Sequence, residues 1–257
     1  MDIIISGYPK SGNTWATRLI AECLNSPVVG YYNKPENNEI AIEGLDRTGK
    51  FKVYKSHDLK SNILKTNPAA TIITIRRDPR ETLASAYRFF EVRSYWSKYP
   101  GNQHFPLKQF YKLLDITFPW KRNNSRRILH AFIKGDWRVH PALGVSWVNY
   151  YTDSLNSTPQ SYHLSYEKLI KDPINALKPI IQSIDPESVG NIPDAVSNQS
   201  FDSVKRKFRE NGSFDKANFL KSGKTDSWKA LLTDSEVKTI EKSAAPLMRN
   251  FGYRMKS

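Results

Sequence analysis

Residues 3–15 constrain the fold of this chain more than any other stretch. An apolar run at residues 3–5 is typical of a buried strand, a loop bounded by Gly7 and Gly12 follows it, and a helical pattern begins at Thr14. The N–H groups of a glycine-rich turn and of the first turn of a helix converge on one point, where the helix dipole also favours negative charge. The stretch therefore predicts a phosphate-binding loop between a strand and a helix.

The spacing of Gly7 and Gly12 is also that of the nucleoside-triphosphate P-loop. However, Asn13 stands where that loop has its lysine, and the lysine lies inside the loop, as Lys10. A kinase of this type also needs an acidic Mg²⁺ ligand at a strand end, whereas the strand ends here are basic. A P-loop small-molecule kinase is therefore the weaker interpretation.

Length and composition predict one soluble domain. The 257 residues, of which 39% are hydrophobic, suffice for a single sizeable α/β core over 1–257. The lone Cys23 excludes an internal disulfide and a cysteine-based zinc site, which is typical of a reducing cytoplasm. No apolar run is long enough to cross a bilayer, and Met1 leads directly into the first strand. We therefore expect a cytoplasmic protein without membrane contact.

The formal net charge of +14 indicates an anionic partner. A basic nucleic-acid-binding protein would explain this charge together with the many aromatic residues, and it predicts affinity that falls steeply with salt. A strongly anionic small nucleotide would be attracted by the same charge. We favour the nucleotide, because polar residues also gather at the expected strand ends.

Strands alternate with helices along the chain, which predicts a parallel sheet with its ligands beyond the carboxyl ends of the strands. We expect strands at 51–55, 70–75 and 161–164, with Lys55 and His57 at the end of the first and Arg77 at the end of the second. We also expect a connection without regular structure at 30–50, a helix at 142–155, one helix at 166–184 and a flexible basic loop at 201–229.

The string Tyr-Pro-Lys-Ser-Gly-Asn-Thr-Trp at residues 8–15 resembles the 5′-phosphosulfate loop of the cytosolic-type sulfotransferases, whose donor is 3′-phosphoadenosine 5′-phosphosulfate (PAPS). The resemblance extends from residue 3 to about residue 230. It implies an α/β fold of the P-loop type, with three layers and a central parallel sheet flanked by helices. It also implies that the loop binds the donor, through Lys10, Ser11, Gly12, Asn13, Thr14 and Trp15.

A second block, from Ile75 to Ser85, is similar to the family's 3′-phosphate block, in which an arginine and a serine eight residues later hold that group. This spacing selects Arg77 and Ser85. A guanidinium fork matches the paired oxygens of a phosphate, and a hydroxyl completes its shell.

A third block resembles the family's segment that closes over the nucleotide, and it implies donor contacts from Phe219, Leu220, Lys221, Ser222 and Gly223. Lys221 replaces the arginine of that segment and Ser222 its lysine, so one cationic contact is weakened and another is lost. By the same resemblance, Tyr166 and Phe201 contact the adenine.

The resemblance also assigns the chemistry. His57 stands two residues beyond Lys55, which matches the family's Lys-x-His pair, and an unperturbed imidazole pKa of about 6.5 suits a general base. Lys10 and Lys55 would neutralise charge that develops on the leaving phosphate oxygen. The sulfuryl group of PAPS then passes to an acceptor hydroxyl, adenosine 3′,5′-bisphosphate leaves, and no metal is required.

The acceptor and the assembly are less constrained. For a short chain without a membrane anchor, the resemblance to the family implies a small hydroxylated metabolite as acceptor. The aromatic residues of 94–137 suit an acceptor-binding lid. The dimer motif of the animal enzymes is half matched, by Lys229 and Thr233, which favours a monomer or a weak homodimer.

Overall fold

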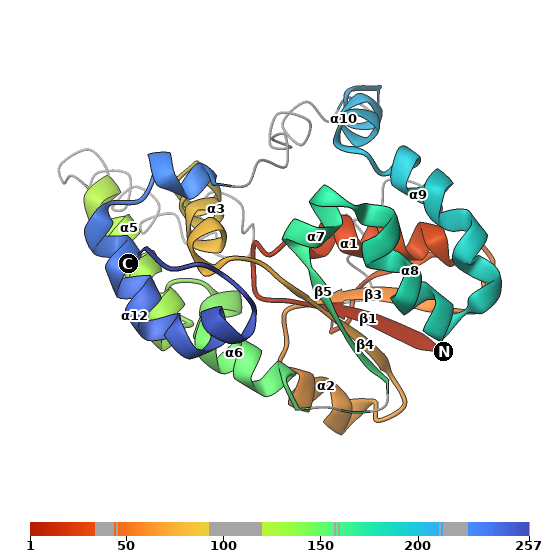
Figure 1. Cartoon of the computed structure of the whole chain (residues 1–257), viewed down its shortest axis with the longest axis horizontal. Coiled ribbons are helices and arrows are strands. Elements are labelled where there is room, and N and C mark those ends of the chain that lie inside the picture. The colour runs from red at the N-terminus through yellow and green to blue at the C-terminus, as the bar shows by residue number, and fades with distance from the viewer. Residues whose placement is uncertain are drawn as a thin grey trace, which may run out of the picture. The chain divides into compact units, whose positions relative to one another are not determined.

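The chain divides into two compact units in the computed structural model (Figure 1), which describes residues 1–33, 44, 46–92, 120–156, 158, 160–210, 212 and 226–256. The first unit comprises Met1–Arg77 and Tyr150–Asp226, and the second comprises Asp78–Asn149 and Ser227–Ser257. The single domain over 1–257 and the acceptor lid at 94–137 stay predictions. Of the proposed lid, residues 94–119 lie outside the described residues.

The first unit contains a five-stranded sheet in which every neighbouring pair is parallel, in the order β2-β3-β1-β4-β5. Ile4 of β1 is paired with Tyr54 on one side and with Ile72 on the other, so β1 is the central strand. The predicted parallel sheet is confirmed. The strands are β1 (Asp2–Ser6), β2 (Val28–Tyr31), β3 (Lys52–Ser56), β4 (Thr71–Arg76) and β5 (Ser161–Ser165).

Helices cover both faces of this sheet (Figure 1), which explains why β1 is apolar without alternation. Ile3 and Ile5 belong to a core shared with α1 and α8, whereas Ile4 belongs to a separate core with Ile63 of α2. The predicted three-layer arrangement is therefore confirmed. The helices of this unit are α1 (Asn13–Cys23), α2 (Lys60–Thr66), α7 (Tyr166–Lys171), α8 (Pro173–Ile184), η3 (Pro186–Asn191), α9 (Ile192–Asn198) and α10 (Phe201–Glu210).

Two predictions about loops were wrong. The edge strand β2 extends two residues into the connection expected at 30–50, and it pairs with β3 through a register shift between Val28 and Gly30. Residues 34–43 and 45 of that connection lie outside the described residues. The basic loop expected at 201–229 begins with the helix α10, and the N–H of Ser203 donates to Ser200 Oγ, the pattern of an N-cap.

Two helix predictions also need correction. The helix expected at 166–184 is two helices, because Asp172 caps α8 by accepting from the Asn175 N–H and Pro173 occupies the first turn. The helix expected at 142–155 is the 3₁₀ turn η2 (Pro141–Leu143) followed by α6 (Trp147–Ser154).

The second unit is helical, and its described elements are α3 (Pro79–Val92), α5 (Trp120–Lys134), η2, η4 (Ser227–Ala230) and α12 (Asp234–Asn250). Trp147 is fully buried there, stacked on Phe132 at 6.4 Å and edge-on to Phe251 at 6.2 Å between ring centroids.

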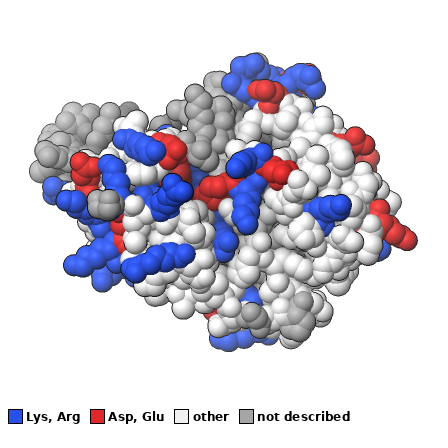
Figure 2. Space-filling model, viewed as in Figure 1, with Lys and Arg blue, Asp and Glu red and all other residues white. Residues whose placement is uncertain are grey.

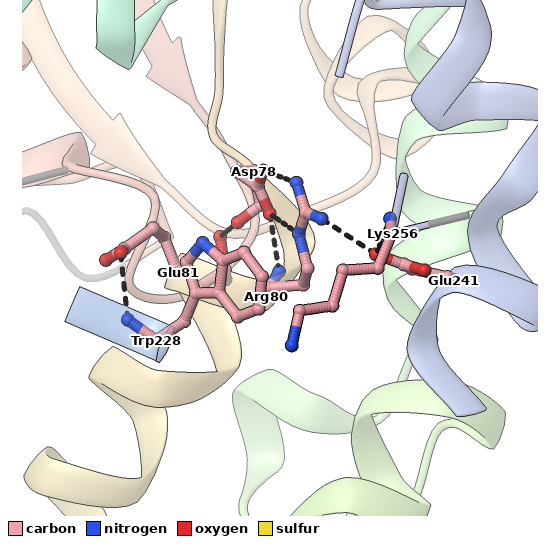
Figure 3. Close-up of polar contacts among 7 residues, drawn as sticks. Asp78, Arg80, Glu81, Trp228, Glu241 and Lys256 are labelled. Carbon is pink, nitrogen blue, oxygen red and sulfur yellow. Dashed lines mark hydrogen bonds and ion pairs between the residues drawn. The ribbon is translucent and has the colours of Figure 1, made fainter. Parts of the chain in front are cut away.

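A buried polar network joins the start of α3 to η4 and α12 (Figure 3). The guanidinium of Arg80 donates to Asp78 at 2.6 Å and to Glu241 at 2.7 Å. Glu81 accepts the backbone N–H of Trp228 at 3.1 Å, and the Arg80 Cζ lies 4.4 Å from the Trp228 ring centroid. One buried cation thus serves two carboxylates and one aromatic face.

Among the helices that the structure describes, none combines the length and the apolar character that a bilayer-spanning segment needs.

Candidate active site

The loop between β1 and α1 has the backbone geometry of an anion site. Lys10 and Gly12 adopt left-handed conformations, with φ of 72° and 99°. The N-terminus of α1 follows this loop directly, and none of the described side chains caps it, so its first-turn N–H groups can bind an anion there. At Gly7 an added Cβ would lie 2.2 Å from Asn13 Oδ1 and 2.7 Å from the Ile75 carbonyl oxygen, so only glycine fits.

Asn13 braces this loop from within. Its side-chain Nδ2 donates to the carbonyl oxygens of Gly7 at 3.1 Å and Tyr8 at 3.0 Å, and the residue is buried. The amide group therefore faces the loop's own backbone, at the position where a nucleoside-triphosphate loop has its lysine. This geometry explains how the loop keeps its shape without that lysine.

His57 lies beside the same loop. Its Nδ1 is 2.8 Å from the Gly7 carbonyl oxygen, which thus receives both the imidazole and the Asn13 amide. A carbonyl only accepts, so Nδ1 carries the proton, and the lone pair of the neutral ring is on Nε2. This tautomer is the one that a general base acting through Nε2 requires.

Lys55, at the end of β3, reaches the first turn of α1. Its Nζ donates to Thr14 Oγ1 at 3.0 Å and to the Tyr31 hydroxyl at 3.0 Å, and it lies 4.6 Å from the Tyr31 ring centroid. Lys55 is buried. The end of β3 thus brings Lys55 to Thr14 and His57 to Gly7, and the prediction that both face one donor stays a prediction.

Arg77 follows β4 and reaches the loop from the opposite side. Its Nη1 donates to the Lys10 carbonyl oxygen at 3.2 Å, and its Cζ lies 4.2 Å from the ring centroid of Tyr166. The sheet order accounts for this convergence, because β3 and β4 flank β1 and β5 leads into Tyr166. Four strand ends thus contribute side chains to one loop.

The residues predicted to contact the adenine form an aromatic cluster around Trp15. Its ring is edge-on to Tyr166 at 6.0 Å and tilted toward Phe201 at 5.3 Å between centroids. The indole Nε1 donates to the Gln199 carbonyl oxygen at 2.8 Å, which fixes the ring plane. Trp15 therefore joins the two residues that the sequence analysis proposed separately.

Two tyrosines of α6 complete the site, and the sequence analysis gave neither of them a role. The Tyr151 hydroxyl lies 3.0 Å from Ser11 Oγ and donates to the Ile75 carbonyl at 2.9 Å. The Tyr150 hydroxyl lies 2.6 Å from Ser6 Oγ. The sequence predicts the helix that carries both tyrosines, but it does not show their partners Ser6 and Ser11, which are more than a hundred residues away in the chain.

Two parts of the predicted site stand apart from this loop. Ser85 is half-buried on α3, in the second unit, so its pairing with Arg77 on one phosphate stays a prediction. The proposed donor contacts in the third block lie outside the described residues, namely Phe219, Leu220, Lys221, Ser222 and Gly223.

The surface and the acidic residues bear on the other interpretations. On the face shown in Figure 2, Lys and Arg side chains lie over both units, with acidic side chains among them. Within the described part of the chain, no group of three or more His, Cys, Asp or Glu residues could hold a metal ion.

The lone cysteine is chemically quiet. Burial raises the pKa of the Cys23 thiol to about 12, so the thiol stays protonated at neutral pH.

Known proteins share this architecture. Human sulfotransferase 2A1 is 24% identical over 262 residues, which cover 94% of this chain and 82% of the relative. Mouse sulfotransferase SULT7A1, solved in complex with PAP, has a TM-score of 0.65 at 19% identity, with 97% of this chain and 85% of that chain covered. Retinol dehydratase in complex with androsterone and the inactive cofactor PAP has a TM-score of 0.60 at 17% identity, with 97% and 81% covered. The sulfotransferase domain family matches residues 1–252, and the chain therefore belongs to this family.

Proposed function

We propose that this protein transfers the sulfuryl group of PAPS to a hydroxyl of a small-molecule acceptor, with His57 as general base. The observation that carries the proposal is the convergence on one loop of His57, Lys55 and Arg77, which arrive from different strands. In this reaction the acceptor oxygen bonds to sulfur, the bond from sulfur to the phosphate oxygen breaks, and adenosine 3′,5′-bisphosphate leaves.

The donor's phosphates fit the charges of the first unit. The left-handed turn at Lys10 and Gly12 and the uncapped N-terminus of α1 offer backbone N–H groups to the 5′-phosphosulfate. Arg77 offers a guanidinium for the 3′-phosphate, as the family block implies. Two of the similar solved structures contain PAP, that is, adenosine 3′,5′-bisphosphate, which supports the same nucleotide for this chain.

The base and the cations have separate tasks. His57 holds its Nδ1 proton on the Gly7 carbonyl, so Nε2 can accept the proton of the acceptor hydroxyl. The Lys55 ammonium group, buried beside Thr14, would stabilise negative charge on the leaving phosphate oxygen, together with Lys10. Burial strengthens this interaction because little water screens it.

The His57→Ala variant tests the assignment. We expect its turnover with PAPS and a hydroxylated acceptor to fall by about 10²- to 10⁴-fold, the usual contribution of a general base. Calorimetry should show nearly unchanged affinity for adenosine 3′,5′-bisphosphate. His130→Ala, an exposed position on α5, is the matched control.

Two outcomes would contradict the proposal. Unchanged turnover in His57→Ala would remove the imidazole from the mechanism. Binding of ATP with Mg²⁺ in preference to adenosine 3′,5′-bisphosphate by the wild-type protein would instead support the kinase interpretation.

A further inference from the structure

Two adjacent buried tyrosines form hydrogen bonds to different parts of the site, Tyr151 to the anion loop and Tyr150 to the segment that carries His57. Tyr150 and Tyr151 are 3% and 0% exposed, and their rings pack edge to face at 5.4 Å between centroids. Burial raises the pKa of both phenols above the usual value, so both hydroxyls stay protonated at neutral pH. Each therefore has one proton to donate.

Tyr151 acts on the anion loop. Its proton goes to the Ile75 carbonyl, which can only accept, and Ser11 Oγ must then donate to the Tyr151 oxygen. The backbone N–H of Ser11 donates to the Tyr8 carbonyl at 3.1 Å. Both hydrogen-bond donors of Ser11 thus point into the protein, and Tyr151 joins the loop to the end of β4, two residues before Arg77.

Tyr150 acts on the segment that carries His57. Its hydroxyl lies 3.1 Å from the Asp58 carbonyl oxygen and 2.6 Å from Ser6 Oγ, and Ser6 Oγ lies 3.0 Å from the same carbonyl oxygen. Because each hydroxyl has one proton, one of the two donates to the carbonyl and the other donates to its neighbouring hydroxyl. The Asp58 N–H in turn donates to Ser56 Oγ at 3.0 Å. The residues on either side of His57, Ser56 and Asp58, are therefore both held by hydrogen bonds, and His57 itself bonds to the Gly7 carbonyl.

We propose that Tyr151 is a positioning residue for the anion loop and Tyr150 a positioning residue for His57, so that neighbouring hydroxyls control nucleotide binding and base orientation separately. This inference rests on the proposed function. It predicts that removing one hydroxyl impairs one of these properties and leaves the other intact.

The test compares Tyr151→Phe with Tyr150→Phe, the latter also combined with Ser6→Ala because Ser6 Oγ still reaches the Asp58 carbonyl. Phenylalanine keeps the ring packing, so each protein should fold. Calorimetry with adenosine 3′,5′-bisphosphate reports on the loop, and the NMR pH titration of the His57 imidazole reports on the base. Tyr162→Phe, whose hydroxyl contacts Ser183 Oγ at 2.8 Å on the surface, is the control.

For Tyr151→Phe we expect the Kd of the bisphosphate to rise about tenfold, the size of a lost buried hydrogen bond or two, with the His57 titration unchanged. For Tyr150→Phe with Ser6→Ala we expect a displaced His57 titration and a Kd within about twofold of wild type, which is less than one net hydrogen bond. Equal effects of both substitutions on both readouts, or no effect of Tyr151→Phe on the Kd, would overturn the inference.

A failure of the proposed function gives a different result. The wild-type protein would then fail to bind the bisphosphate at all. Amide hydrogen exchange of residues 7–12 would still decide the tyrosine inference: Tyr151→Phe should accelerate it and Tyr150→Phe should not. Equal exchange in both variants would refute the separate roles.

Discussion

Gly12 is the position at which the loop geometry makes its sharpest prediction. Its φ of 99° is left-handed, and an added Cβ would lie 2.5 Å from Tyr166 Cδ2 and 2.8 Å from Cε2. The Tyr166 ring cannot easily yield, because it is buried, Arg77 Cζ lies 4.2 Å from its centroid and Trp15 contacts its edge. The Gly12→Ala substitution therefore incurs both a backbone and a packing cost.

The two costs can be estimated separately. The left-handed backbone costs an L-residue about 1–2 kcal/mol. Forcing extra volume into a packed site costs about 1–3 kcal/mol more. We therefore expect Gly12→Ala to lower the free energy of unfolding by about 2–5 kcal/mol, a large part of the stability of an ordinary domain.

Two other glycines isolate these contributions. Gly252 has a φ of 78°, and an added Cβ would have no atom of another described residue beyond its chain neighbours within 4 Å, so Gly252→Ala should show the backbone cost alone. Gly190 has open space and no left-handed φ, so Gly190→Ala should be nearly neutral. Urea denaturation followed by circular dichroism measures all three free energies of unfolding.

If Gly12→Ala lowers the free energy of unfolding no more than Gly252→Ala does, Tyr166 imposes no packing cost and the prediction is wrong. Calorimetry with adenosine 3′,5′-bisphosphate gives a second check. A displaced Tyr166 ring would also move Arg77, so Gly12→Ala should weaken nucleotide binding, whereas Gly252→Ala should not.

Two further substitutions test the charged groups. Arg77→Ala should weaken adenosine 3′,5′-bisphosphate about 10- to 100-fold by calorimetry, as expected for a lost charge-assisted hydrogen bond, and should affect adenosine 5′-monophosphate far less. Equal losses for both nucleotides would show that Arg77 supports the loop through the Lys10 carbonyl and does not read the 3′-phosphate. Arg80→Met leaves the Asp78 and Glu241 carboxylates buried without their cation, and we expect the free energy of unfolding to fall by about 3–5 kcal/mol. The ion pair of the exposed Arg138 with Asp136 is the comparison, since Arg138→Met should lower the free energy of unfolding far less in the same urea titration.

The central sheet could be predicted because burial on both faces leaves a plain signal. β1 carries the run Ile3–Ile5, β4 has three isoleucines interspersed with two threonines and is buried over its first five residues, and each strand is followed by residues that favour a turn or a helix start. The edge strand β2 was missed because it has only four residues and contains Gly30, with a φ of 141°. A short strand of this kind forms because β3 offers it a partner, which is not a local property.

The helix boundaries were missed for a different reason. The Asp-Pro pair at 172–173 gives the same start signal as the pair at 78–79, and both precede helices. The prediction of one helix over residues 166–184 treated Pro173 as a proline within a helix, whereas Pro173 occupies the first turn of α8. At α10 the opposite happened, because Gly212 and the charge run concealed a capped helix that ends at Glu210.

The polar connections of the site could not be predicted from the sequence. A tyrosine on a helical pattern is most simply a core residue, and nothing local shows that Tyr151 meets Ser11 or that Tyr150 meets Asp58. Their bonds depend on the sheet order, which brings the ends of β1, β3 and β4 together under α6. Motifs therefore predict which groups face the ligand, whereas the groups behind them can be found only from the fold.

The position of Asn13 explains why cations from several strand ends lie beside this loop. In a nucleoside-triphosphate loop one lysine at that position serves the phosphates directly. Here the Asn13 amide donates to the carbonyls of Gly7 and Tyr8 instead, and Lys10 of the loop is supplemented by two cations from neighbouring strands, Lys55 on one side and Arg77 on the other. Under the proposed function, substitutions that shift β3 or β4 against β1 should therefore weaken binding of adenosine 3′,5′-bisphosphate in calorimetry, even where they are far from the loop.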